Sequence, residues 1–375
     1  MLVCEACGRE YADTTEAWRC DCGHALDFAD TPVPDADAAP DPHTLDRDRG
    51  LWAFEEFLPV DARVTLGEGW TPLVDAPGWG CQFKLESLFP TGSFKDRGAT
   101  ATLSRASELD VDRVVEDSSG NAGLAIATYA ARAGIDARVY VPADAKPGKL
   151  DAIERTGVEV VRVEGSRGDV TDACIERVEA AGPTDADGTW YASHAWNPAF
   201  FAGTATFALE LAAQRDWTPP DAVVTPLGHG TLLLGAYRGF RALERAGWID
   251  ELPRLLGAQA TGAAPIADAL GEARNADGAD PDSTRDPNEA ADGIQIRDPA
   301  RKDQVLAALR ETGGDAIAVG PDPTRREHDR LARAGFHVEP TCATATAALE
   351  VFRERGSLSR SEDVVVVLTG TGLKG

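Results

Sequence analysis

The sequence contains little lysine, a single methionine and no excess of positive charge. Methionine occurs only as Met1, and lysine occurs at six positions, which are Lys84, Lys95, Lys146, Lys149, Lys302 and Lys374. The 37 basic residues are outnumbered by 62 acidic ones, which gives a formal net charge of −25. Nucleic acids and anionic membranes attract proteins with a basic face, so neither is expected as a partner.

Long apolar runs are also missing. No run approaches the ~20 residues that a membrane helix needs. Residues 1–5 do not combine a basic start with an apolar stretch, as a secretory signal would. The chain is nevertheless 43% hydrophobic, which is enough for a core. We therefore expect a cytoplasmic α/β protein, and its length suggests two domains, or one domain with an appendage.

The acidic residues are spread along the chain. A surface rich in carboxylates and poor in lysine is typical of adaptation to strong salt, because salt screens the mutual repulsion of the carboxylates. An acidic interaction tail, the ordinary alternative, would concentrate the charge in one place. The composition predicts a salt-adapted protein that is destabilised in dilute buffer.

Four of the seven cysteines lie within the first 22 residues. Two residues separate Cys4 from Cys7, one separates Cys20 from Cys22, and a glycine follows each pair. Paired thiolates in tight turns can complete a tetrahedral zinc shell. Disulfides are the alternative, but they are rare in cytoplasmic proteins. The pattern predicts a structural zinc ion in a zinc-ribbon-like knuckle.

After a proline- and acid-rich linker, short β-rich runs alternate with helical patterns. This alternation predicts an α/β fold in which helices cover both faces of a parallel sheet. The acidic segment 271–293 is expected to be a surface loop. The expected strands are residues 111–116, 137–141, 158–163, 190–193, 222–225, 255–259, 316–319 and 364–368. The expected helices end near residues 132 and 181 or span residues 147–156, 198–215, 231–246 and 263–270.

Four glycine- or hydroxyl-rich segments follow strands or lie close to their ends, where open α/β sheets bind ligands. In residues 90–98, small and aromatic neighbours can desolvate Lys95 and lower its pKa, although a surface lysine that opens a helix is the alternative. Residues 117–123 place hydroxyls and N–H groups at a helix start, which suits a carboxylate. Residues 226–231 suit a phosphate, and residues 368–374 offer a hydroxyl to a ring nitrogen. Together these are the parts needed to bind pyridoxal 5′-phosphate, whereas no Walker loop or dinucleotide motif is present.

Five segments, in chain order, resemble the threonine synthase family. They are GEGWTPL at 67–73, KLE at 84–86, PTGSFKDRG at 90–98, SSGNAG at 118–123 and TGTGLK at 369–374. The resemblance covers the chain from about residue 66 to the end, and the cysteine pairs are similar to the knuckle of some archaeal members. It implies the two-domain, parallel-sheet α/β fold of type II pyridoxal-phosphate enzymes, similar to tryptophan synthase β. The implied parts are a knuckle (1–28), a linker (29–50), a large cofactor-binding domain (51–98 and 205–375) and a small α/β domain (99–204).

The resemblance also implies roles for individual residues. Lys95 would bond covalently to the cofactor and later move protons. Asn121 would bind the cofactor's 3′-hydroxyl, and Thr369 would face its ring nitrogen. The cofactor phosphate would be held by Gly228, His229, Gly230 and Thr231, and the substrate carboxylate by Ser118, Ser119 and Gly120. A hydroxyl at the ring nitrogen leaves the pyridine largely uncharged, which favours elimination or replacement at the substrate side chain.

The chain departs from the family pattern in two places. The phosphate loop reads Gly-His-Gly-Thr where an asparagine-containing loop is common. Phe200 lies where members that use O-phosphohomoserine usually have an arginine, the natural partner of a substrate phosphate. Arg97 and Arg167 are candidate replacements for this arginine.

The resemblance implies an enzyme that converts O-phosphohomoserine and water into threonine and phosphate. The alternative is a related ammonia-lyase or β-replacement synthase that acts on another amino acid. A third reading, an interaction protein built on an inactive enzyme scaffold, is disfavoured because Lys95, Asn121 and Thr369 are all present. Dimers are usual in the family, so a homodimer is expected.

Overall fold

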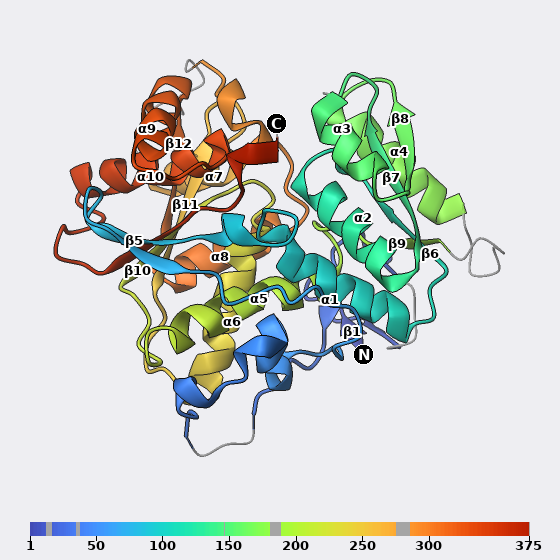
Figure 1. The fold of residues 1–375 in the computed structure, drawn as a ribbon, viewed down its shortest axis with the longest axis horizontal. Coiled ribbons are helices and arrows are strands. Elements are labelled where there is room, and N and C mark those ends of the chain that lie inside the picture. The colour runs from blue at the N-terminus through green and yellow to red at the C-terminus, as the bar shows by residue number, and fades with distance from the viewer. Residues whose placement is uncertain (13–16, 35–37, 146, 181–188, 275–285, 375) are drawn as a thin grey trace.

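The computed structural model describes residues 1–12, 17–34, 38–145, 147–180, 189–274 and 286–374. Their strands form three sheets, and Figure 1 shows the two larger sheets in separate halves of the molecule, with helix α1 (Lys95–Glu108) between them. The smallest sheet has the strand order β2 (Glu10–Tyr11), β1 (Leu2–Val3), β3 (Asp27–Phe28). The six-stranded sheet has the order β12 (Asp315–Val319), β11 (Arg254–Ala260), β10 (Ala222–Pro226), β13 (Val364–Val367), β5 (Cys81–Lys84), β4 (Leu73–Ala76). The four-stranded sheet has the order β8 (Glu159–Val163), β7 (Asp136–Pro142), β6 (Arg113–Glu116), β9 (Thr189–Tyr191).

Nine further α-helices are present in the described part of the chain. They are α2 (Asn121–Ala133), α3 (Pro147–Glu154), α4 (Arg167–Ala180), α5 (Pro198–Ala213), α6 (Thr231–Arg245), α7 (Pro265–Arg274), α8 (Lys302–Glu311), α9 (Pro321–Arg333) and α10 (Pro340–Glu354). Short 3₁₀ helices are η1 (Pro42–Thr44), η2 (Arg47–Phe57), η3 (Glu86–Leu88), η4 (Glu289–Ile294) and η5 (Gly372–Lys374). None of the described helices is long and apolar enough to cross a membrane.

The six-stranded sheet is covered by helices on both faces. Its central strand β13 is a run of valines whose side chains alternate between the two faces, as the pleat of a strand requires. Val365 and Val367 pack with apolar residues of α5, α6, α7 and α8, whereas Val364 and Val366 pack with residues of α9 and α10. A strand that is apolar on both faces is typical of such buried parallel sheets.

One strand of this sheet departs from the predicted parallel arrangement. β4 pairs with β5 in antiparallel register, for example Ala76 with Cys81. Only residues 77–80 connect the two strands, and Gly80 turns the chain at φ +59°. A connection this short joins only antiparallel neighbours, because parallel strands need a crossover of a dozen or more residues. β4 and β5 were not among the predicted strands.

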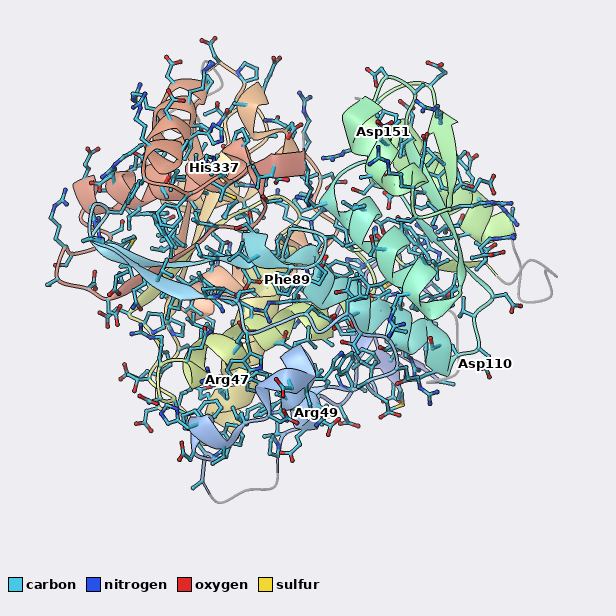
Figure 2. All side chains as sticks on the ribbon, viewed as in Figure 1. Arg47, Arg49, Phe89, Asp110, Asp151 and His337 are labelled. Atoms are coloured by element: carbon cyan, nitrogen blue, oxygen red, sulfur yellow. The ribbon has the colours of Figure 1, made fainter. Side chains whose placement is uncertain are left out.

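The four-stranded sheet is parallel throughout. On one face Val114 and Trp190 pack with residues of α1 and α2, and on the other Val115 and Tyr191 pack with residues of α4. Figure 2 shows the exposed carboxylates Asp110 and Asp151 at opposite ends of this half of the molecule. Acidic side chains here face water.

The N-terminal sheet is fastened to the rest of the protein through Arg301 and Trp18. The buried Arg301 guanidinium lies 2.9 Å from both oxygens of Asp27 and donates to the carbonyl oxygens of Leu26 (2.8 Å) and Trp196 (2.7 Å). The ring of Trp18 meets the rings of Tyr191 and Trp196 edge-on, at centroid distances of 5.2 Å. The N-terminal segment thus packs against Tyr191, at the end of β9, and against Trp196, in the connection to α5.

Each predicted strand and helix overlaps an observed one. The predicted strand 111–116 is β6, and the predicted helix 198–215 is α5. The predicted loop 271–293 begins inside α7 and ends in η4, while residues 275–285 lie outside the described residues.

Candidate active site

A cavity of ≈100 Å³ lies beside the carboxyl ends of strands from both larger sheets. The residues that follow β6, β10 and β13 line it, as expected for a ligand site in α/β proteins. Helices α1, α2 and α6 begin at Lys95, Asn121 and Thr231, and all three residues line the cavity. Helix N-termini carry partial positive charge and unpaired N–H groups, so the cavity is suited to anionic ligands.

Lys95 contributes an uncommitted amine to the cavity. Its Nζ lies 4.8 Å from the centroid of the Phe94 ring, and no described group accepts a hydrogen bond from it. Burial lowers the pKa of Lys95 to about 8, although the nearby Glu116 carboxylate acts in the opposite direction. An amine with a lowered pKa can act as a nucleophile near neutral pH.

The loop after β10 supplies N–H donors. Gly228, His229, Gly230 and Thr231 all line the cavity, and their backbone N–H groups donate to no other described group. The Nδ1 atom of His229 is buried and has no hydrogen-bond partner among the described residues. Gly230 has φ +80°, and a Cβ there would lie 2.4 Å from Cγ2 of Val305. Position 230 therefore requires glycine, and the N–H donors of the loop that have no partner lie at the cavity.

The segment between β6 and α2 forms a second wall. Ser118, Gly120 and Asn121 line the cavity, whereas Ser119 is not among the lining residues. The Asn121 amide nitrogen donates to both Glu339 carboxylate oxygens at 2.9 and 3.0 Å. Its oxygen accepts from Lys374 Nζ at 2.7 Å. Asn121 is thus oriented by two charged residues from the C-terminal part of the chain.

Thr369 lines the cavity from the end of β13 and is buried. Its Oγ1 lies 3.5 Å from the Cys342 thiol of α10. The predicted residues Lys95, Ser118, Gly120, Asn121, Thr369 and the four loop residues 228–231 therefore meet at one cavity.

Sequence reasoning missed several cavity residues, among them Asp117, His194, Glu339 and Thr341. Asp117 follows a predicted strand directly, so the strand-end signal was available for it. Glu339 and Thr341 flank the start of α10 and carry no such signal, because their closeness to Asn121 depends on the order of strands in two sheets.

Arg97, a candidate partner of the substrate phosphate, and Phe200, which stands in place of the usual arginine, do not line the cavity. Arg97 is fully buried, with Nε 2.7 Å from Glu86 and NH2 2.9 Å from Glu210, so the expectation that it could serve the substrate is wrong. Phe200 is fully buried in the cluster between α1, α2 and the four-stranded sheet. A Cβ on Gly98 would lie 2.1 Å from the Phe200 ring, so this ring fills the space where α5 meets α1.

Arg167 lies at the rim of the cavity. It is the first residue of α4, it is exposed, and it is among the lining residues. Its guanidinium makes no hydrogen bond or salt bridge with any described residue. Arg167 therefore offers the cavity a guanidinium with no hydrogen-bond partner, whereas Arg97 is already paired with Glu86 and Glu210.

The sequence that surrounds this cavity matches a known protein family. The pyridoxal-phosphate dependent enzyme family matches residues 64–370, a span that includes all the predicted cofactor residues. The chain belongs to this family. It is 32% identical to the threonine synthase of Methanocaldococcus jannaschii, over 99% of this chain and 92% of that protein. It is also 32% identical to the threonine synthase of Methanosarcina acetivorans, over 100% of this chain and 92% of that protein.

Solved structures of related pyridoxal-phosphate enzymes share the fold. A threonine deaminase from T.th. is 27% identical, with a TM-score of 0.60 over 78% of this chain and 87% of that one. A pyridoxal 5′-phosphate-dependent aspartate racemase is 25% identical, with a TM-score of 0.65 over 80% of this chain and 90% of that one. The architecture is thus that of pyridoxal-phosphate enzymes with several different activities.

The residues present fit pyridoxal phosphate. The cofactor needs a reactive amine and a phosphate site, and the cavity offers the unbonded Lys95 Nζ and the unsatisfied donors of residues 228–231. The N-terminus of α6, which begins at Thr231, adds to the phosphate site the positive partial charge that an anion requires.

The four N-terminal cysteines also lie together. Their sulfur atoms all lie within 4.8 Å of one another, with Cys4 and Cys22 at 3.5 Å and Cys7 and Cys20 at 3.5 Å. A tetrahedral zinc ion with Zn–S bonds of ~2.3 Å separates its sulfurs by ~3.8 Å, so the cluster has suitable dimensions. At 3.5 Å the thiols are too far apart for S–S bonds, which are ~2.05 Å long.

Proposed function

We propose that this pyridoxal-phosphate enzyme is a threonine synthase, which converts O-phosphohomoserine and water into threonine and phosphate. The observation that carries the proposal is the gathering of an unbonded amine, a glycine loop rich in N–H donors and an uncommitted arginine at one cavity. The near full-length similarity to two archaeal threonine synthases supports the choice of substrate.

Each cofactor-binding residue has a proposed task. Lys95 holds the cofactor covalently, and the N–H groups of residues 228–231 bind its phosphate together with the His229 ring. Thr369 presents its hydroxyl to the ring nitrogen. When bound, pyridoxal phosphate supplies an electron sink that stabilises negative charge on the substrate α carbon.

The protein's own groups bind the substrate and move its protons. Ser118 and Gly120, the two predicted carboxylate-binding residues that line the cavity, hold the substrate carboxylate at the start of α2, where the helix dipole stabilises a negative charge. Ser119 does not line the cavity and is given no task. Lys95 transfers protons at the α carbon, because its lowered pKa lets it accept and release a proton near neutral pH. Asn121 keeps its orientation through Glu339 and Lys374.

Arg167 is the proposed partner of the substrate phosphate. A phosphate monoester carries close to two negative charges at neutral pH. Arg167 is the arginine among the lining residues, and the carboxylates of Asp117 and Asp292 act on its charge without a hydrogen bond to it. This assignment explains how the chain works with Phe200 in place of the usual arginine. Arg167→Met is expected to raise KM for O-phosphohomoserine by at least about tenfold, the loss of one charge-assisted hydrogen bond or more, while leaving cofactor absorbance intact.

The zinc knuckle is proposed as a structural element. Cys4, Cys7, Cys20 and Cys22 would bind one zinc ion and so hold β1, β2 and β3 together. The segment docks through Asp27 and Trp18, and none of its described residues lines the cavity, so the metal would take no part in the chemistry.

The decisive experiment is a product balance. The purified, cofactor-loaded protein is incubated with O-phosphohomoserine, and threonine and phosphate are measured together. Equal amounts of both support the proposal. L-threonine, L-serine and O-acetylserine are tested in parallel, because an ammonia-lyase or β-replacement synthase would release ammonia or acetate from them. Turnover of one of these without threonine formation from O-phosphohomoserine would overturn the proposal.

A further inference from the structure

A buried carboxylate lies directly beneath the candidate active site. Glu116 ends β6 and is fully buried, and its Oε1 lies 2.6 Å from Nδ1 of His194. The backbone N–H of His194 donates to the other oxygen of the same carboxylate at 3.2 Å. Both the ring and the main chain of His194 are therefore held by one side chain.

This arrangement leaves one ring nitrogen of His194 uncommitted. Nδ1 is occupied by Glu116, while Nε2 has no hydrogen-bond partner among the described residues. His194 lines the cavity that also holds Lys95, and its ring stands nearly perpendicular to the His229 ring at a centroid distance of 5.2 Å. A carboxylate that orients one imidazole nitrogen while the other faces a reaction site is the arrangement of a general base.

A purely structural role does not require these residue types. Burying a carboxylate costs free energy unless charged or hydrogen-bonding groups compensate it, and the positions before Glu116 on β6 are filled by Val114 and Val115. Burial raises the pKa of Glu116 to about 8 and lowers the pKa of His194. The charged groups that act on this pair are Lys95, Asp117 and Arg167. Both shifts favour the uncharged forms near neutral pH, so the His194 ring is unprotonated there.

We propose that His194 is a second catalytic base, which takes a proton from the water that adds to the substrate, and that Glu116 is its positioning residue. The inference rests on the proposed threonine synthase activity. That reaction needs water to attack the β carbon after phosphate has left, which is a different task from the proton transfers at the α carbon given to Lys95.

The proton and electron movements balance. One O–H bond of the water breaks, its proton passes to His194 Nε2, and its oxygen bonds to the β carbon. The electron pair of the alkene between the α and β carbons moves to the α carbon, which receives a proton from Lys95. His194 then returns its proton to Lys95 through water, so both residues regain their starting states.

The test separates elimination from water addition. His194→Asn and Glu116→Gln are compared with wild type for phosphate, threonine, 2-oxobutanoate and ammonia formed from O-phosphohomoserine. Without water addition, the intermediate hydrolyses to 2-oxobutanoate and ammonia, which together with phosphate account for all atoms of the substrate and one water. We expect His194→Asn to lower threonine formation by about 10²-fold or more, with phosphate release reduced much less and 2-oxobutanoate replacing threonine. Glu116→Gln should give the same shift to a smaller extent.

The control is His337→Asn, which changes an exposed histidine labelled in Figure 2 that does not line the cavity. Its product ratio should equal that of wild type. Threonine and phosphate in a one-to-one ratio from His194→Asn would overturn the proposal for His194. No phosphate release by wild type would instead overturn the proposed function.

A second measurement does not depend on activity. In apo protein labelled with ¹⁵N-histidine, Glu116→Gln should shift the ring resonances of His194 and leave those of His337 in place. Unchanged His194 resonances would show that the pair does not exist in solution, and would overturn the positioning role of Glu116.

Discussion

Phe200→Arg tests whether position 200 belongs to the active site or to the core. Sequence comparison alone places a phosphate-binding arginine at this position, which would make the substitution beneficial for a phosphorylated substrate. In the structure Phe200 is 0% exposed and packs with Ala99, Leu103 and Trp190. The Phe200 ring leaves no room for even a Cβ on Gly98, so a longer, charged side chain must push α1 and α5 apart.

Two contributions lower the folding stability of Phe200→Arg. A charge buried without a partner costs about 3–5 kcal/mol, and the apolar burial of the ring is lost in addition. The His194 ring lies 6.1 Å from the Phe200 ring between centroids, and Glu116 already holds that histidine. At ~2 °C per kcal/mol for a chain of this size, the charge alone should lower the melting temperature by about 6–10 °C, and the lost apolar burial adds to this.

Thermal unfolding of the apo protein, followed by tryptophan fluorescence, measures this shift, and Trp190 lies in the same cluster. Phe200→Leu is the matched control. It keeps an apolar side chain and should lower stability by only ~1–1.5 kcal/mol. If Phe200→Arg is as stable as Phe200→Leu and lowers KM for O-phosphohomoserine, the assignment of position 200 to the core is refuted, and so is the role of Arg167.

Three further predictions concern the amine, the knuckle and the surface charge. Because burial lowers the pKa of Lys95 to about 8, the neutral amine becomes more abundant as pH rises, and cofactor association with the apo protein should speed up about tenfold between about pH 7 and pH 9. Borohydride should then trap the cofactor on the peptide that contains Lys95; a pH-independent rate, or label on Lys84, would contradict this. Metal analysis should find one zinc per chain, and Arg301→Met should expose the N-terminal segment to proteolysis, since it removes one of the two arginines that pair with buried Asp27 and the bonds to the carbonyl oxygens of Leu26 and Trp196; zinc-free folded protein, or an unchanged cleavage rate, would contradict these two expectations. The melting temperature should rise with KCl concentration because salt screens the net charge of −25, and a melting temperature independent of salt would refute the role given to the acidic surface.

The sequence by itself determined the class of fold and the kind of ligand. Short β-rich runs predicted these strands, because a strand that is buried on both faces is apolar along most of its length. The segments around Lys95, Asn121 and Thr369 could be interpreted one at a time, since strand, glycine loop and helix start are neighbours in the chain. The spacing of the four cysteines was equally local, and their sulfur atoms lie within 4.8 Å of one another.

Contacts between segments that are distant in the chain became known only from the folded structure. Glu116 and His194 are 78 residues apart, and Asn121 and Glu339 are 218 apart. Their pairing depends on which strands are neighbours, which no local pattern encodes. The same holds for Arg97, where the sequence shows an arginine beside the reactive lysine. Helix α1 turns it away from the cavity, toward Glu86 and Glu210. Residues two positions apart on a helix point about 200° apart, so Arg97 lies on the opposite face of α1 from Lys95 and becomes part of the core.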